Sequence, residues 1–219
     1  MHRNCPSIRY LLLEMNTNDD KKKKNEIMKF LLLIKHWQLF ILTLGAPIIM
    51  QIVLIVTTIT SEDPFSDFAT IIFIIPITMI LVMIIFFGWF YAMGTNLHKK
   101  LPESEKMNLT KFKIFLFIPL IYILAICFFI VFVINYTITN EVTPNFALFG
   151  FIIPVHLFSM FCIFYCLYFN AKALKAVELQ RPVKFGDFAG EFLLIWFYPI
   201  GIWIIQPRIN KLFKEQASV

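Results

Sequence analysis

The chain has 219 residues, 59% of them hydrophobic, and a mean hydropathy of +0.75, whereas soluble domains contain roughly 45–50% apolar residues. The apolar excess lies in long uncharged runs, which excludes an ordinary soluble domain and predicts helices that lie in a lipid bilayer. The net charge of +6 does not indicate nucleic acid as a partner, because the sequence has no basic soluble domain with interleaved aromatic residues.

The first 35 residues form a charged segment that precedes the first long apolar run. They contain eight Lys and Arg residues. The stretch MNTNDDKKKKNE (15–26) is typical of a disordered lead-in, and it makes Met15 an alternative start to Met1. Within residues 1–26 the apolar run 10–13 is too short for a signal peptide. We therefore expect residues 1–35 to be a cytoplasmic N-terminal segment.

Four apolar runs reach the length of a membrane span. Each has 21 to 25 residues, and at about 1.5 Å per residue a helix of that length crosses a hydrocarbon core of roughly 30 Å. Unpaired backbone groups are costly in lipid, so each run is expected to be helical. The predicted spans are residues 37–59, 69–93, 114–134 and 146–169.

The distribution of charge predicts the orientation. The connections after the first and third spans, residues 60–68 and 135–145, contain acidic side chains but no Lys or Arg. All 20 basic residues lie in the N-terminal segment, in residues 94–113 and 170–190, and in the C-terminal tail. Basic loops of membrane proteins stay on the cytoplasmic side, so we expect a cell (inner) membrane protein with both termini in the cytoplasm.

A shorter apolar run follows the fourth span, within residues 191–206. It has 14 apolar residues, from Phe192 to Ile205, with Pro199 near its centre, and a helix of this length reaches only about 21 Å. A full crossing would also place the basic tail, residues 207–219, outside the cell. We predict a re-entrant or interfacial segment within a single membrane domain (36–214), with a short tilted fifth span as the alternative.

Few polar side chains lie inside the predicted spans. His156 is the ionisable side chain nearest the middle of the membrane, and Gln51, Thr78 and Tyr122 fall at similar or neighbouring depths. An ionisable side chain in a membrane is by default a functional hypothesis, and these four residues form a candidate polar layer. The alternative is a neutral His156 that joins helices through a hydrogen bond.

The sequence has no recognisable catalytic or cofactor motif. His156 and Ser159 lie one helical turn apart, but no carboxylate accompanies them. No metal-spaced Cys and His motif or nucleotide-binding glycine motif is present, so we expect no catalytic residue, metal or cofactor. The lysines of residues 94–113 would attract anionic lipid headgroups, and a second copy of the chain or another membrane protein is an open partner.

Two similar stretches suggest an internal duplication. FIIPIT (73–78) in the second span and FIIPVH (151–156) in the fourth share their first four residues, and parallel repeats of this kind occur in transporters. A chain so rich in Phe and Ile also produces short matches by chance, so both interpretations stay open.

The stretch FGDFAGEFLLIWFYPIGIWIIQPRIN, residues 185–210, resembles the ending of a group of small, uncharacterised bacterial multi-pass membrane proteins. The resemblance implies that several of its residues form one unit, and it brings no activity with it. This candidate C-terminal motif consists of Asp187, Glu191, Pro199, Gly201, Gln206, Pro207, Arg208 and Asn210.

Together these patterns predict an all-α polytopic membrane helix bundle with four transmembrane helices and a short C-terminal hydrophobic segment. The expected role is that of a non-enzymatic structural or accessory membrane component. One alternative is a small transporter or permease-like protein with a central polar site at His156, Gln51 and Thr78. Another is a membrane enzyme that acts on lipid at the cytoplasmic face through Asp187, Glu191 and His98.

Overall fold

The computed structural model describes residues 19, 22–23, 25–60, 64–140 and 149–214. In that part of the chain every regular element is a helix, which confirms the all-α prediction. Residues 25–33 form an N-terminal helix. The further elements are α2 (His36–Phe40), the π-helical turn η1 (Ile41–Gly45), α3 (Ala46–Thr60), α4 (Pro64–His98), α5 (Leu109–Asn140), α6 (Phe149–Leu179), α7 (Phe185–Trp196) and α8 (Tyr198–Lys214).

Four helical stretches are long and apolar enough to cross a membrane, as the sequence predicts. They are His36–Thr60, Ile74–His98, Leu109–Thr137 and Ile152–Leu179. The second and fourth continue past the predicted span ends at residues 93 and 169. They do so because their last turns are packed in the protein core, where Leu97 and Leu174 are fully buried.

Prolines lie inside the long helices without ending them. Pro76, Pro119 and Pro154 are interior to α4, α5 and α6. The apolar run of residues 191–206 is divided instead, because Phe197, between α7 and α8, has a non-helical backbone with φ −83° and ψ 57°. The break thus precedes Pro199, which lies in the first turn of α8, where a missing N–H is tolerated.

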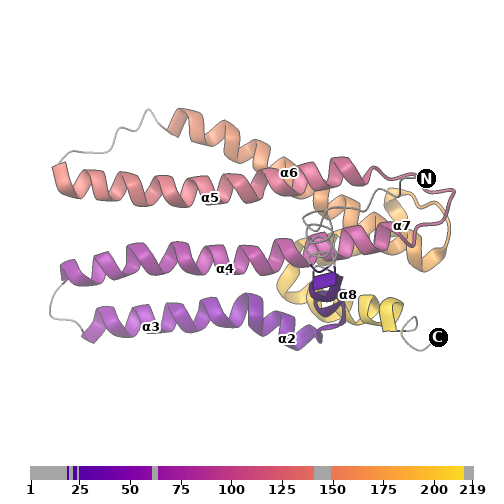
Figure 1. The fold of residues 1–219 in the computed structure, drawn as a ribbon, viewed down its shortest axis with the longest axis horizontal. Helices are drawn as coiled ribbons and strands as arrows, with labels where there is room; N and C mark the ends of the chain where they lie inside the picture. The colour runs from indigo at the N-terminus through magenta and orange to yellow at the C-terminus, as the bar shows by residue number, and fades with distance from the viewer. Residues whose placement is uncertain (1–18, 20–21, 24, 61–63, 141–148, 215–219) are drawn as a thin grey trace, which may run out of the picture.

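The long helices lie side by side and define two ends of the molecule (Figure 1). We call one the far end, where α3 and α5 finish and α4 and α6 begin. We call the other the basic end, where α7 and α8 lie and where α4 and α6 finish. The acidic residues Glu62 and Glu141 lie outside the described residues, but the helices that their connections join meet at the far end (Figure 1).

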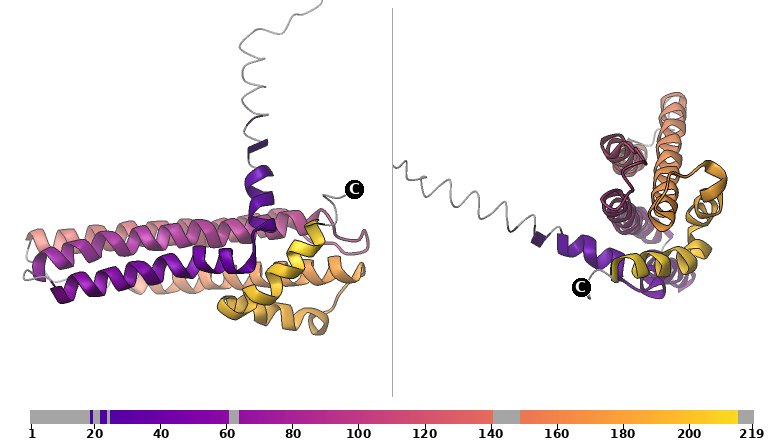
Figure 2. Two further views of the ribbon diagram at one scale, coloured as in Figure 1. Left: turned by 90° about the horizontal axis from the view of Figure 1, so that it is seen from below. Right: turned by 90° about the vertical axis from the view of Figure 1, so that its right-hand side faces the viewer.

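The basic end carries two additions to the four long helices. α7 and α8 form a helical hairpin, with α7 packed on α6 and α8 packed on α2. The N-terminal helix runs across the bundle axis (Figure 2). The prediction of a disordered lead-in is therefore wrong for the described residues of 15–26, namely 19, 22, 23, 25 and 26, which are helical. The helix forms because its apolar residues Met28, Leu31 and Leu32 pack against the core.

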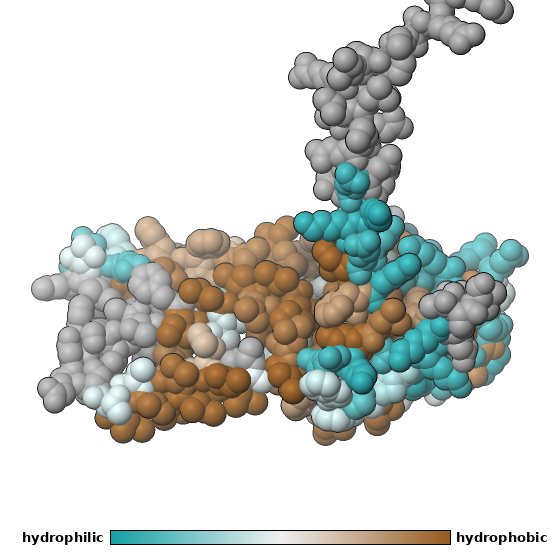
Figure 3. Space-filling view, turned by 60° about the horizontal axis from the view of Figure 1, so that its bottom comes forward, coloured by the Kyte–Doolittle hydropathy of each residue, from teal (hydrophilic) through white to brown (hydrophobic). Residues whose placement is uncertain are grey.

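The buried core lies at the basic end. Its largest fully buried side chains come from α2, α4, α5, α6, α7 and α8: Trp89, Phe90, Phe112, Phe169, Phe188, Leu39, Met93, Leu97, Leu174, Ile195, Ile202 and Ile205. Toward the far end most of the described apolar side chains face outward, among them Ile59, Phe128 and Phe132. The surface there is mostly hydrophobic, whereas hydrophilic residues gather at the basic end (Figure 3), the division expected for helices that face lipid.

Candidate functional site

Polar side chains of α7 and α8 meet the second half of α6 and the N-terminal helix at the basic end. Glu191 lies on the buried side of α7, a helix whose other charged residue is Asp187 in the first turn. The second half of α8 supplies the amide and guanidinium groups. We call the following side chains the C-terminal cluster: Lys175, Glu178, Glu191, Gln206, Arg208 and Asn210.

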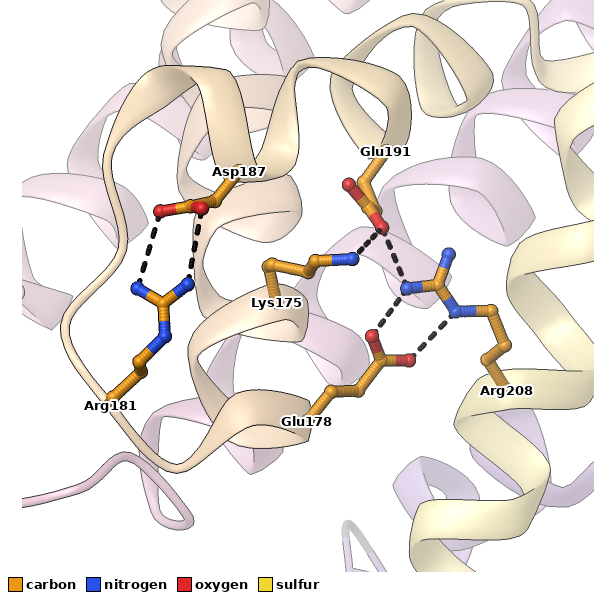
Figure 4. A network of polar contacts seen from close by, with 6 residues as sticks. All are labelled: Lys175, Glu178, Arg181, Asp187, Glu191 and Arg208. Carbon is orange, nitrogen blue, oxygen red and sulfur yellow. Dashed lines mark hydrogen bonds and ion pairs between the residues drawn. The ribbon is translucent and has the colours of Figure 1, made fainter.

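Arg208 joins α8 to both α6 and α7 (Figure 4). Its Nε donates to Oε1 of Glu178 at 2.7 Å, and a terminal nitrogen donates to the other oxygen of Glu178, so the pair is bidentate. The same terminal nitrogen donates to Oε1 of Glu191 at 2.7 Å. Lys175 of α6 donates to that Glu191 oxygen at 3.0 Å. Three helices are therefore joined through two carboxylates and two cations.

The environment of Glu191 keeps it ionised. The side chain is only 7% exposed, and this burial acts to raise its pKa, but hydrogen bonds from Arg208 and Lys175 outweigh burial and leave the pKa below its usual value. The hydrogen bonds from Arg208 to Glu178 and Glu191 likewise raise the pKa of the guanidinium, against the effect of burial. A carboxylate held in this way serves as an ion-pair partner and is unsuited to give or take a proton near neutral pH.

Asp187 belongs to the start of α7 and makes separate contacts. Its Oδ2 accepts a hydrogen bond from the backbone N–H of Lys184 at 2.8 Å, which satisfies a free donor at the helix N-terminus. Arg181 forms a two-nitrogen pair with the same carboxylate, at 3.2 and 3.4 Å (Figure 4). The backbone N–H, followed by Arg181, lowers the pKa of Asp187. The geometry gives Asp187 the role of a helix cap.

Gln206 connects α8 to α4 and to the N-terminal helix. Its fully buried side chain accepts a hydrogen bond from Nε1 of Trp89 at 2.8 Å and donates to the backbone oxygen of Ile34 at 2.9 Å. It also lies 3.3 Å from the backbone oxygens of Leu31 and Leu32. The last carbonyls of a helix have no partner within the helix. Gln206 of α8 supplies a hydrogen-bond donor for those at the end of the N-terminal helix.

Asn210, one turn further along α8, completes the same cap. Its Nδ2 donates to the backbone oxygens of Leu32 at 2.7 Å and Ile34 at 3.2 Å. Two amide side chains of the C-terminal helix thus hold the end of the N-terminal helix. Residues from opposite ends of the chain form one unit.

Gly201 and Tyr198 fix the hairpin itself. A Cβ added at Gly201 would lie 1.6 Å from the backbone oxygen of Leu194, so α8 approaches α7 at a point where only glycine fits. Tyr198, at the start of α8, shares a hydrogen bond of 3.0 Å with Thr43 in η1. The tip of the hairpin therefore lies beside the second turn of the first candidate span. The two other motif residues, Pro199 and Pro207, are exposed.

The candidate polar layer separates into two parts. Tyr122 and His156 share a hydrogen bond of 3.2 Å between α5 and α6. Gln51 and Thr78 instead line a cavity of about 410 Å³ between α3 and α4, and Tyr122 and His156 are not among the described residues that line it. The hydroxyl of Thr78 donates to the backbone oxygen of Ile74 at 2.8 Å. The structure does not bring the four side chains to one site.

The residues of the lipid-enzyme hypothesis also have separate partners. Nε2 of His98 lies 2.8 Å from the backbone oxygen of Met107, and the surface hollow beside it is lined by residues of 98–109 that do not include Asp187 or Glu191. Both of those carboxylates are paired elsewhere. The described residues contain no group of three or more His, Cys, Asp or Glu side chains that could hold a metal ion.

Sequence reasoning missed the α6 and α4 partners of the C-terminal motif. Lys172, Lys175 and Glu178 recur every third residue on α6, on one helical face of a mostly apolar stretch, and this spacing could have indicated a buried ionic face. Lys172 pairs with Glu105 at 2.9 Å. Trp89 carried the weaker signal that a buried indole N–H needs an acceptor.

No family model, curated protein or solved structure matches the chain. The resemblance of residues 185–210 to small bacterial membrane proteins therefore stays a prediction, and the duplication of residues 73–78 and 151–156 stays one of two open interpretations. The function has to be argued from the geometry of the C-terminal cluster and of the cavity between α3 and α4.

Proposed function

We propose that the protein is a non-enzymatic structural or accessory component of the bacterial inner membrane. The observation that supports this role is the use of the polar groups in the C-terminal cluster. Glu178 and Glu191 are both ion-paired, and Gln206 and Asn210 are committed to backbone carbonyls. Groups engaged in this way hold the N-terminal helix, α4, α6, α7 and α8 together as a rigid platform.

The proposal includes an orientation. The described Lys and Arg residues all belong to segments at the basic end, and the positive-inside rule assigns that end and both termini to the cytoplasm. The hairpin of α7 and α8 then enters from the cytoplasmic side and turns back at Phe197. Its contact with Thr43 at 3.0 Å supports a shallow element, because Thr43 lies near the start of the first span.

A small transporter is the second candidate, and the cavity between α3 and α4 favours it. The cavity measures about 410 Å³ and is lined mainly by apolar side chains, with Gln51 and Thr78 among the few polar ones. Such a lining suits an uncharged or lipid-like solute better than an ion, since buried carboxylates usually mark ion pathways. We rank this function second because His156 is not part of the cavity lining.

The two functions predict opposite mutational patterns. Glu191→Gln removes a charge from the C-terminal cluster, and Val82→Trp fills the cavity, which Val82 lines. Each variant would be expressed in a strain that lacks the wild-type gene. The protein and lipid composition of that strain's membrane would then be compared with the composition in a wild-type strain. The accessory role predicts that Glu191→Gln fails to restore the composition and that Val82→Trp restores it. The reverse pattern would contradict the accessory role and support transport.

A stability measurement shows whether the cluster itself is structural. Glu191→Gln leaves two cations facing a neutral amide, and hydrogen bonds to charged groups contribute about 1.5–3 kcal/mol. A loss of about 2 kcal/mol lowers the thermal midpoint of a chain of this size by roughly 4–8 °C. The control is Glu103→Gln, because Glu103 is exposed in the loop after α4. If Glu191→Gln melts with wild type, the cluster has no structural role.

A further inference from the structure

A second cavity lies at the basic end, in the angle between the N-terminal helix and the last turns of α4. Its volume is about 410 Å³. The C-terminal part of α8 closes one side. The residues that line it are Lys29, Leu32, Leu33, Asn96, Lys99, Lys100 and Phe213.

The polar part of this cavity is cationic. Lys29 comes from the N-terminal helix, and Lys99 and Lys100 follow the end of α4. Lys99 is exposed and lies 3.4 Å from the side-chain oxygen of Asn96, a neutral partner. None of the described residues that line the cavity is acidic. The ammonium of Lys100 also donates to the backbone oxygen of Leu212, another neutral partner. Three lysines from two segments therefore line a space whose charge suits a phosphate group.

The apolar part of the cavity distinguishes a lipid from a free anion. Leu32, Leu33 and Phe213 supply a hydrocarbon wall beside the amines. The ammonium of Lys100 lies 4.1 Å from the centre of the Phe213 ring, which shows that charged and apolar groups share this wall. A free phosphate gains nothing from such a wall, whereas the first carbons of an acyl chain do.

The N-terminal helix beside the cavity has the features of a helix that lies at a membrane surface. It runs across the bundle axis (Figure 2), and Ile27 and Phe30, which are 53% and 59% exposed, lie one turn apart with exposed Leu33 following them. A helix that combines such a face with lysines is typical of one lying in the interface of a bilayer. Lipid headgroups are therefore the nearest source of phosphate.

We propose that this cavity binds the phosphate of an anionic membrane lipid, with Lys29, Lys99 and Lys100 around the headgroup and Leu32, Leu33 and Phe213 against the start of an acyl chain. The site goes beyond the accessory function, because it assigns a specific ligand to one place on the platform. It holds for any role that the whole protein performs.

The test uses the full-length protein in vesicles of phosphatidylcholine with an increasing share of phosphatidylglycerol. Native mass spectrometry of protein released from the vesicles counts retained lipids. Wild type is expected to retain one phosphatidylglycerol in preference to phosphatidylcholine. The double variant Lys29→Gln/Lys99→Gln is expected to lose affinity for it by about 10- to 30-fold, the effect of removing two cations near the lipid surface. Both leaflets carry the same lipid, so the result does not depend on the proposed orientation.

The matched control is Lys106→Gln/Lys113→Gln, which removes the same charge from the same end of the molecule but outside the cavity. It is expected to bind phosphatidylglycerol like wild type, and an equal loss in both double variants would overturn the site in favour of general surface attraction. If the double variant Lys29→Gln/Lys99→Gln does not fold, Lys99→Glu replaces it in the same measurement, because this variant reverses the charge of a side chain that is exposed. If inorganic phosphate alone stabilised the detergent-solubilised protein as much as phosphatidylglycerol does, the lipid assignment would be overturned.

Discussion

The basic end and the far end of this bundle are held by different interactions. At the basic end large aromatic and aliphatic side chains are fully buried, and the polar groups among them have defined partners, such as Trp89 and Gln206 at 2.8 Å. Toward the far end most apolar side chains face outward. Helices in lipid are expected to need specific contacts only where they pack against each other. Substitutions should therefore lower the free energy of unfolding strongly at the basic end and little at the far end.

Gly201→Ala is expected to have the largest effect. The added Cβ would lie 1.6 Å from the backbone oxygen of Leu194, so α7 and α8 would have to separate, with a loss of at least about 3 kcal/mol, the upper range for overpacking. Thermal unfolding in detergent measures it. Gly190→Ala is the control, because nothing lies within 4 Å of a Cβ at Gly190. Equal stability of the two variants would show that the hairpin is not closely packed.

Gln206→Leu should come next, with a loss of about 2–3 kcal/mol. It leaves the buried indole N–H of Trp89 without its acceptor and the carbonyl of Ile34 with the longer bond from Asn210 alone, and an unsatisfied buried group costs about 1–3 kcal/mol. Gln51→Leu is the matched change in the other half, at an exposed position that lines the apolar cavity. We expect it to stay within about 0.5 kcal/mol of wild type. A larger loss for Gln51→Leu would reverse the contrast between the two ends.

The contribution of Glu191 is expected to depend on pH. Its pKa is lower in the folded protein than the ordinary value of about 4.3, so the unfolded chain takes up a proton first as the pH falls. The stabilisation is therefore complete above about pH 4.3 and is lost at lower pH. The measurement is the difference in thermal midpoint between wild type and Glu191→Gln from pH 7 to pH 3. A difference that does not shrink in acid would argue against the ion pairs.

Tyr122→Phe should have the smallest effect. It removes a single hydrogen bond of 3.2 Å to His156, and such bonds between membrane helices contribute about 0.6 kcal/mol on average. Thermal unfolding would show a shift of about 2 °C or less. A loss as large as that of Gln206→Leu would mean that the far half is held by polar contacts too.

The features that sequence could predict are those that depend on local composition. The four candidate spans follow from apolar length alone. The candidate C-terminal motif instead came from a resemblance, and it includes four residues whose side chains join segments, Glu191, Gln206, Arg208 and Asn210. The N-terminal helix was missed. Its charged flank hid the apolar residues that pack against the core, and its cap lies more than 170 residues away in the chain.

The arrangement of side chains around a helix could not be predicted in the same way. Gln51, Thr78, Tyr122 and His156 share a depth along the helices, but depth does not determine the direction in which a side chain points, and the four separate into two places. The break at Phe197 also divides into α7 and α8 an apolar run that the sequence presents as one segment. It brings Gly201 of α8 against the backbone of Leu194 in α7, a contact between helices that no local pattern records.

The most direct test of the account is the side of the membrane on which each end lies. In a cysteine-free background, Asn140→Cys and Lys214→Cys are treated in intact cells with a maleimide that does not cross the inner membrane. Both residues are exposed, Asn140 at the far end and Lys214 at the end of α8. The account predicts labelling at 140 in intact cells and at 214 only after the membrane is opened. Labelling at 214 in intact cells would show a fifth crossing and contradict a hairpin that turns back at Phe197.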